Sequence, residues 1–265
     1  CFAAYRLHWK GVLHRDIRPP NVVMKTYNQS TVNVEIENSS VGKFSYVPME
    51  GKIPCLIDFD ISLLNTKLEP FMYLKSDYLQ KAETLYGPTY ILQTHNELAK
   101  EEVWFTYSID YWMIGLTAMS SIMPRFWAYY TKRYDIVPKS VQNFFSYYSK
   151  EIIGILWSMA NLSAAMGAIQ YIHIPVLNAI DPENNPFQKV ASELNPQLRS
   201  LLAKLFTWSA LVISPTEILM DPYFESLRIA NVCVQCGKVA KVKCLDCPME
   251  ENVYCSNECH LEIKH

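Results

Sequence analysis

Hydrophobic and polar positions divide most of the chain into short elements around one long apolar helix. Residues 2–10 mix apolar and basic side chains like the last turns of a helix, and Gly11 supplies a stop signal. Residues 108–123 are apolar on most faces, which predicts a central buried helix. The amphipathic stretch 194–206 predicts another helix, and residues 215–227 predict a last short one.

Short β segments are expected in the first sixty residues. The apolar runs Val12-Leu13 and Val22-Val23-Met24 stand on either side of a polar loop, and Cys55-Leu56-Ile57 predicts a short buried strand. Residues 25–54 are rich in Asn, Ser, Val and Lys, which indicates an inserted hairpin or loop. Residues 66–105 alternate turn signals with short helical stretches.

Residues 152–180 contain no Asp, Glu, Lys or Arg, and a stretch of that length raises the question of a membrane helix. Polar residues interrupt it, however, and it lies between segments that are typical of one globular lobe. We therefore favour a charge-free core helix, with no membrane partner. The interrupting residues are Asn161, Ser163, Gln170, His173 and Pro175.

Composition favours a folded domain. Half of the 265 residues are hydrophobic and 13% are aromatic, which is ample for a core. The net charge of −2 gives no reason to expect nucleic acid as a partner. The chain begins with Cys1 and ends on His265 inside a metal-ligand pattern, so we expect both ends to be cuts through a longer polypeptide.

The cysteines are concentrated near the end of the chain. Six of the eight lie within the last 33 residues, in closely spaced pairs. This spacing predicts zinc ligation in the reducing cytoplasm rather than disulfides. Thiolates and imidazole are ligands that tetrahedral zinc prefers, and metal would supply the folding energy of so short a segment. The predicted ligands are Cys233, Cys236, Cys244, Cys247, Cys255, Cys259 and His265.

One loop carries the residue types that phosphoryl transfer needs. The run His14-Arg15-Asp16-Ile17-Arg18-Pro19-Pro20-Asn21, called the 14–21 loop below, places an acid and an amide five residues apart. Asp58 follows an apolar strand further along. Transfer from a nucleotide needs a carboxylate that orients the attacking hydroxyl, and hard oxygen ligands for Mg²⁺.

This set of residues resembles the eukaryotic-type protein kinases. The matching blocks stand in the family's order: residues 14–21, 57–59, 108–115, 198–206 and 217–224. The resemblance implies a kinase C-lobe over residues 1–227, with an α+β, mainly α-helical fold. It places the amino-terminal lobe, with its Gly-rich loop and ATP-binding Lys, before Cys1.

The resemblance also implies a role for each loop residue. Asp16 would accept the proton of the substrate hydroxyl, while Asn21 and Asp58 would hold Mg²⁺ against ATP. Arg18 stands where Ser/Thr kinases usually have a Lys that contacts the γ-phosphate. Arginine keeps the charge of lysine but not its shape.

Three further residues would have supporting roles. His14 belongs to the loop itself, and Arg15 would pair with a phosphate or an acid on the activation segment. Asp110 corresponds to the family's aspartate at the start of a central helix, which supports the backbone of the catalytic loop.

The sequence departs from the kinase pattern in three places. Asp60 replaces the glycine of the Asp-Phe-Gly motif, which adds a carboxylate and removes backbone freedom. Leu92-Gln93-Thr94 replaces the Ala-Pro-Glu motif, and Val212 replaces the arginine that pairs with its Glu. Losing both partners of a buried ion pair lowers the stability of the fold less than losing one partner does. The connection from Asn21 to Asp58 is unusually long, and a tolerated surface insertion is the favoured explanation.

The cysteine-rich segment, residues 228–265, resembles the MYND and HIT zinc fingers, and the choice between them stays open. The resemblance implies a small cross-braced treble clef with two zinc ions and a role in recruiting proteins. Cys233, Cys236, Cys255 and Cys259 would hold the first zinc. Cys244, Cys247 and His265 would hold the second, with an eighth ligand beyond the chain end.

Two hypotheses for function remain. The first is a divergent Ser/Thr-type protein kinase that uses ATP and Mg²⁺, with the finger docking a protein partner. The second is a pseudokinase, in which the lobe and the finger both serve as protein-binding scaffold surfaces within a larger assembly.

Overall fold

The computed structural model describes residues 1–35, 43–64, 71–75, 102–130, 134–168, 172, 174–208, 215–229, 242–243 and 253–254. The chain divides into two compact units. The first contains Cys1–Lys25 and Pro54–Tyr223, and the second contains Thr26–Ile53 and Phe224–His265. Most of the inserted segment, Thr26–Ile53, therefore belongs to the same unit as the C-terminal segment Phe224–His265.

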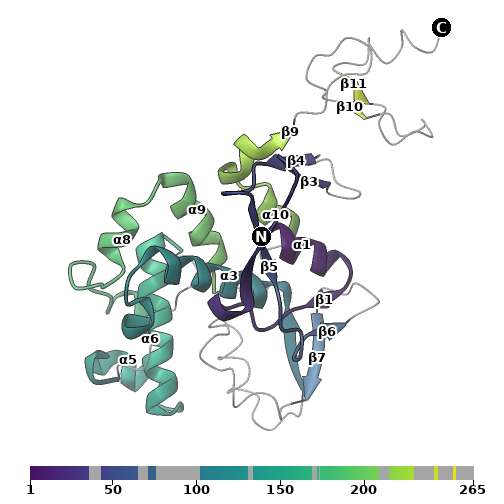
Figure 1. The fold of residues 1–265 in the computed structure, drawn as a ribbon. Coiled ribbons are helices and arrows are strands. Elements are labelled where there is room, and N and C mark those ends of the chain that lie inside the picture. Colours follow the sequence, from purple (N-terminus) through teal and green to yellow (C-terminus); the bar gives the residue numbers. More distant parts are fainter. Residues whose placement is uncertain are drawn as a thin grey trace, which may run out of the picture. The chain divides into compact units, whose positions relative to one another are not determined.

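The first unit is α+β and mainly helical (Figure 1). Its α-helices are α1 (Phe2–Trp9), α3 (Tyr107–Ile122), α4 (Phe126–Tyr130), α5 (Lys139–Phe144), α6 (Lys150–Met166), α7 (Ile174–Leu177), α8 (Gln188–Glu193), α9 (Pro196–Leu205) and α10 (Pro215–Leu219), and 3-10 turns form η1 (Pro19–Asn21) and η3 (Tyr134–Ile136). The helices expected at 2–10, 108–123 and 194–206 are confirmed. The helix expected at 215–227 is divided into α10 and a 3-10 segment, η4 (Pro222–Leu227).

Short antiparallel pairs complete this unit. The strands are β1 (Val12–Leu13), β2 (Val22–Thr26), β5 (Lys52–Leu56), β6 (Leu63–Leu64), β7 (Phe71–Lys75) and β8 (Glu102–Thr106). The pairs are β1 with β6, β2 with β5, and β7 with β8. Two expectations change. The strand at 55–57 ends at Leu56 and is only half-buried, and the edges of the 66–105 region form strands rather than helical turns.

Helix α3 is the centre of the unit and packs against α1, α4 and α9 (Figure 1). The ring of Trp112 meets the ring of Phe206 edge-on, with centroids 5.1 Å apart. A Cβ atom on Gly115 would lie 2.7 Å from Cε1 of Phe206, closer than real contacts allow. The absent side chain of Gly115 is therefore what lets the end of α9 approach α3.

We predict that Gly115→Ala lowers the free energy of unfolding by about 1–2 kcal/mol. Overpacking a buried site costs about 1–3 kcal/mol, and the better helix propensity of Ala returns at most about 1 kcal/mol. Denaturant unfolding measures the difference. Ser121→Ala, at an exposed position of the same helix, should stay within about 0.5 kcal/mol of the natural protein. Equal stability of the two variants would contradict this account.

The first half of the charge-free stretch, as far as Met166, lies in a buried helix, α6, which agrees with the core helix expected from the sequence. Ser149 caps its start by accepting a hydrogen bond from the N–H of Ile152, and Gly167 ends it with a left-handed φ of 93°. The hydroxyl of Ser163 donates to the carbonyl of Phe206 at 2.9 Å and accepts from Nε1 of Trp208 at 3.0 Å. Among the described residues, no helix is long and apolar enough to cross a membrane.

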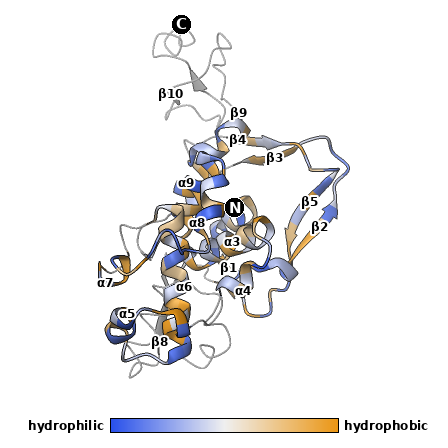
Figure 2. Cartoon of the chain, turned by 90° about the vertical axis from the view of Figure 1, so that its left-hand side faces the viewer, coloured by the Kyte–Doolittle hydropathy of each residue, from blue (hydrophilic) through white to orange (hydrophobic). Residues whose placement is uncertain are grey.

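Helix α9 is amphipathic, with both hydrophobic and hydrophilic residues along its length (Figure 2). The side chain of Asn195 caps its first turn by accepting hydrogen bonds from two backbone N–H groups. Near its end, Lys204 Nζ lies 2.5 Å from Oδ2 of Asp221, whose carboxylate is fully buried. This ion pair joins α9 to the residue that precedes η4.

The second unit contains a three-stranded antiparallel sheet of β3 (Val32–Glu35), β4 (Lys43–Tyr46) and β9 (Arg228–Ile229). Phe44 of β4 pairs with Arg228 of β9 and is fully buried. The guanidinium carbon of Arg228 lies 5.7 Å from the centroid of the Phe44 ring, and Nη1 lies 2.9 Å from Glu225 Oε2. The inserted segment thus contains a hairpin, one of the two forms expected from its sequence, and residues 228–229 at the start of the cysteine-rich segment form a strand beside it. Strands β10 (Val242–Lys243) and β11 (Val253–Tyr254) pair antiparallel.

Candidate active site

The carboxylate of Asp110, in the first turn of α3, holds the start of the 14–21 loop. Its Oδ1 accepts a hydrogen bond from the N–H of Arg15 at 2.7 Å, and its Oδ2 accepts one from the N–H of His14 at 2.8 Å. Nε2 of His8, on α1, lies 2.8 Å from the same Oδ2. Asp110 is fully buried, so its charge is balanced by these donors and by the amino end of α3.

The surroundings of Asp110 stabilise its ionised form. Burial alone would raise its pKa, but the hydrogen bond and charge of His8, with the N–H groups of Arg15 and His14, hold the pKa below its ordinary value of 3.8. Because the folded-state pKa lies below the unfolded-state pKa, the carboxylate contributes stability that is complete above the unfolded-state pKa. That stability is lost as the pH falls through the folded-state pKa.

We predict that Asp110→Ala lowers the free energy of unfolding at pH 7 by about 3–5 kcal/mol, because it strands several buried donors. The gap between variant and natural protein should shrink as the pH falls below the ordinary aspartate pKa, since protonation removes the same interactions. Denaturant unfolding across pH measures both effects. Glu193→Gln, which removes an exposed charge at the end of α8, should change stability by less than about 0.5 kcal/mol at every pH. A constant gap between Asp110→Ala and the natural protein at all pH values would contradict the account.

Aromatic rings enclose this buried pair. The ring of His8 lies 4.6 Å from that of Tyr107 and 5.2 Å from that of Tyr111, measured between centroids. Burial, followed by the negative charge of Asp110, raises the pKa of Tyr111 well above its ordinary value. Tyr111 therefore stays neutral, and the rings keep water away from the His8–Asp110 contact.

The 14–21 loop obtains some of its hydrogen-bond donors from other segments, and its own Pro19 and Pro20 have no N–H. Carbonyls of the loop left without donors would be costly where they are buried. The donor and acceptor pairs are Ser62 Oγ to His14 O (3.2 Å), Asn21 Nδ2 to Asp16 O (2.9 Å), Thr117 Oγ1 to Ile17 O (3.3 Å), Asn21 N to Arg18 O (2.9 Å) and Val22 N to Pro19 O. Side chains from outside the loop thus satisfy two of these carbonyls.

His14 joins the loop to the segment before Asp58. Nδ1 accepts a hydrogen bond from the N–H of Asp16 at 3.3 Å, so the ring proton belongs on Nε2, which donates to the carbonyl of Ile57 at 3.1 Å. The N–H of Ile57 donates in turn to the carbonyl of Asn21 at 3.0 Å. The His14 ring also lies against that of Phe59, with centroids 4.6 Å apart. Residues 57–59 are therefore fixed to the loop.

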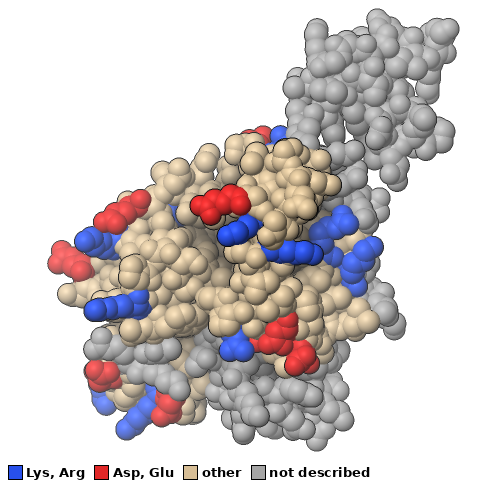
Figure 3. All heavy atoms as spheres, in the orientation of Figure 1, with Lys and Arg blue, Asp and Glu red and all other residues tan. Residues whose placement is uncertain are grey.

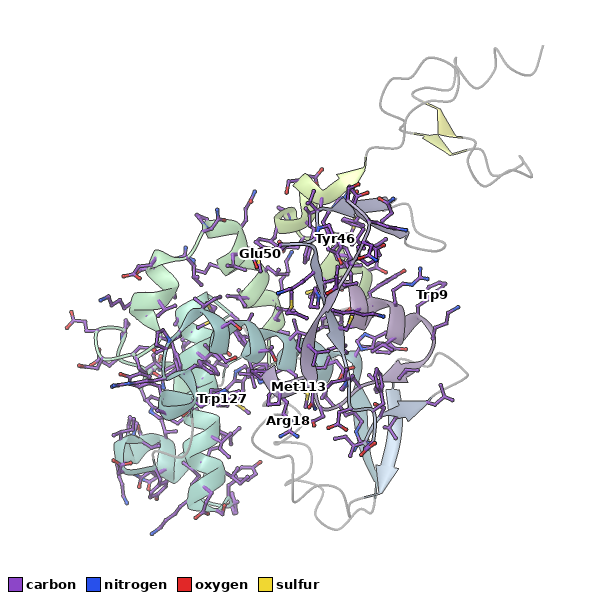
Figure 4. All side chains as sticks on the ribbon, in the orientation of Figure 1. Trp9, Arg18, Tyr46, Glu50, Met113 and Trp127 are labelled. Atoms are coloured by element: carbon purple, nitrogen blue, oxygen red, sulfur yellow. The ribbon has the colours of Figure 1, made fainter. Side chains whose placement is uncertain are left out.

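The two carboxylate oxygens of Asp16 differ in their partners among the described residues. Oδ2 accepts from Nδ2 of Asn21 at 2.7 Å and lies 3.1 Å from Nε of Arg18. No hydrogen bond or ion pair from the described residues reaches Oδ1. Figure 4 shows the Arg18 side chain extending away from the ribbon, which agrees with its 45% exposure. The carboxylate can therefore accept a proton on Oδ1 while Arg18 presents its remaining N–H groups to a ligand.

Asp58 and Asp60 are both exposed. Asp58 has a left-handed φ of 65°, and Arg15, which is buried, has a φ of 68°. Left-handed φ angles are uncommon for residues other than glycine, and the residues that adopt them are concentrated at functional sites. Among the described residues, no hydrogen bond or ion pair joins the Asp58 carboxylate to Asp16 or Asn21. Backbone contacts hold its segment to the loop, but its carboxylate faces outward.

Several predicted site residues lie outside the described part of the chain. They are Leu92, Gln93 and Thr94, which replace the Ala-Pro-Glu motif, and Val212, which replaces the partner arginine of that motif. The expected activation-segment partner of Arg15 also lies there. So do the predicted zinc ligands Cys233, Cys236, Cys244, Cys247, Cys255, Cys259 and His265. Within the described residues, no three potential ligands gather to hold a metal.

Sequence reasoning missed three side chains that support the loop: His8, Ser62 and Thr117. Thr117 had a signal, because it follows Asp110 by seven residues, which is about two helical turns and therefore the same face of α3. A histidine or a serine at the other two positions carried no such signal, since each contact crosses between segments that only the fold brings together.

The described surface in Figure 3 carries charges of both signs close together. On the right-hand part of this face several Lys and Arg side chains lie close together, with Asp and Glu side chains nearby.

No protein-family model matches the chain, and no curated protein matches it either.

Proposed function

We propose that this chain contains the C-lobe of a divergent protein kinase, which transfers the γ-phosphate of ATP to Ser or Thr of protein substrates with the help of Mg²⁺. Its C-terminal segment would be a zinc finger that docks a protein partner. The observation that carries the proposal is the bonding of Asp16: Oδ2 is held by Asn21 and Arg18, and no described residue bonds Oδ1, which would receive the proton of a substrate hydroxyl.

The arrangement suits phosphoryl transfer, in which protein groups mainly position the reactants and stabilise charge. Asp16 would orient the hydroxyl and accept its proton. Arg18 uses Nε on Asp16, which leaves its other N–H groups for phosphate oxygens. Because Asn21 uses its amide nitrogen on Asp16, its amide oxygen is the atom for Mg²⁺. An amide oxygen and the carboxylate of Asp58 are the hard ligands that this ion prefers.

We predict that Asp16→Asn in the full-length protein lowers the rate of phosphoryl transfer about 10²-fold or more, because a general base is lost. The rise in melting temperature caused by Mg-ATP should remain, since Asn preserves the shape of the side chain. Transfer of labelled phosphate and thermal shift measure the two effects, with Glu193→Gln as the control that keeps both. A natural full-length protein whose melting temperature does not respond to Mg-ATP would contradict the proposal.

A pseudokinase scaffold is the second candidate. The outward-facing carboxylates of Asp58 and Asp60 favour it, because Asp58 makes no described contact with Asp16 or Asn21. In this case the lobe and the finger would bind proteins within a larger assembly. Asp16→Asn would then leave the cellular function unchanged, whereas a loss of function by a folded Asp16→Asn protein would exclude the scaffold.

We expect the full-length protein to bind two zinc ions per chain, and Cys244→Ser to reduce the content to about one, because each ion takes about four ligands. Elemental analysis measures the metal content. Cys55→Ser is the matched control, since Cys55 is a free thiol on β5 outside the cysteine-rich segment. Fewer than about two zinc ions in the natural protein would contradict a cross-braced finger.

A further inference from the structure

The carbonyl of Ile17 stands between the two residues that would act on the substrate, Asp16 and Arg18. Ile17 is 3% exposed, so its polar backbone has little access to water. Its carbonyl accepts a hydrogen bond from Oγ1 of Thr117 at 3.3 Å. The two prolines that follow Arg18 cannot supply a donor, so this hydroxyl comes from outside the loop.

Thr117 and Asp110 hold opposite ends of the same short stretch. Both belong to α3, and their spacing of seven residues, about two turns, places them on one face. Asp110 accepts from the N–H groups of His14 and Arg15, and Thr117 donates to the carbonyl of Ile17. Asp16 lies between these two anchor points. Helix α3 therefore restrains the loop on both sides of its acidic residue.

Fixing the Ile17 carbonyl also restrains Arg18. The peptide bond between them is planar, so the orientation of the carbonyl determines the direction of the Arg18 N–H and the position of its Cα. Arg18 has an extended backbone, with φ −147° and ψ 162°, and from it Nε reaches Oδ2 of Asp16 at 3.1 Å. Rotation of this peptide plane would change the direction from which the Arg18 side chain approaches the carboxylate.

We propose that Thr117 is a positioning residue for phosphoryl transfer: its hydroxyl fixes the Ile17–Arg18 peptide and so keeps Arg18 on Asp16. This inference deepens the proposed kinase function and rests on it for its catalytic part. The hydroxyl is the group that matters, because Val has the same shape as Thr without the donor, whereas Ser keeps the donor and loses only a methyl group.

The first test is hydrogen exchange of backbone amides in residues 15–18, which needs no activity. Thr117→Val should accelerate exchange about threefold to tenfold, as expected for one lost hydrogen bond, and Thr117→Ser should stay within about twofold of the natural protein. Ser121→Ala is the matched control, because its hydroxyl donates to the carbonyl of Thr117 within α3 and not to the loop. Should Thr117→Val fail to fold, Thr117→Ala takes its place beside Thr117→Ser.

The second test uses phosphoryl transfer by the full-length protein. Thr117→Val should lower kcat about threefold to tenfold with KM for ATP changed less than about twofold, and Thr117→Ser should restore kcat. Equal exchange in the Val and Ser variants overturns the positioning role, whatever the activity. If the Thr117→Val variant exchanges faster and the natural protein transfers no phosphate, the restraint by Thr117 is supported. Only the kinase proposal is then overturned.

Discussion

The buried carboxylate of Asp110 is the contact on which the candidate site depends. Two consecutive N–H groups of the 14–21 loop and the ring of His8 converge on it, inside an aromatic enclosure that excludes water. A charge in such a place is stable only while every donor is present. The side chain of Asp110 therefore links the loop, α1 and α3, and its lowered pKa reflects this mutual stabilisation.

The other hydrogen bonds of the 14–21 loop accompany its shortage of backbone N–H donors. Two prolines remove N–H groups from the loop. Hydroxyls of Ser62 and Thr117, from outside the loop, satisfy two of its carbonyls, and the side-chain amide of Asn21, within the loop, satisfies a third. The same contacts restrict the backbone on either side of Asp16. A rigid backbone is what a reacting carboxylate requires, because its position must not depend on thermal motion of a surface loop.

The inserted segment between Asn21 and Asp58 pairs with a distant part of the chain, which its sequence alone does not predict. A tolerated surface insertion was the favoured explanation, yet its strand β4 carries β9, the strand at residues 228–229. Phe44 is fully buried beneath the guanidinium of Arg228. The insertion thus supplies the sheet in which the cysteine-rich segment begins.

Much of the architecture was determined by local sequence. Apolar periodicity predicted α1, α3 and α9, the polar interruptions of 152–180 indicated a core helix, and the alternation in 25–54 indicated a hairpin. The residue types of the 14–21 loop identified Asp16 and Asn21 as candidates before any contact was known. Spacing along the chain carries this information because helices and hairpins bring together residues that are near in sequence. Only the tertiary structure decided that His8 and Asp110, 102 positions apart, share one buried pair, that Thr117 reaches Ile17, and that residues 228–229 extend the inserted hairpin. These contacts join segments distant in sequence, and only the packing of the whole chain determines which of them meet.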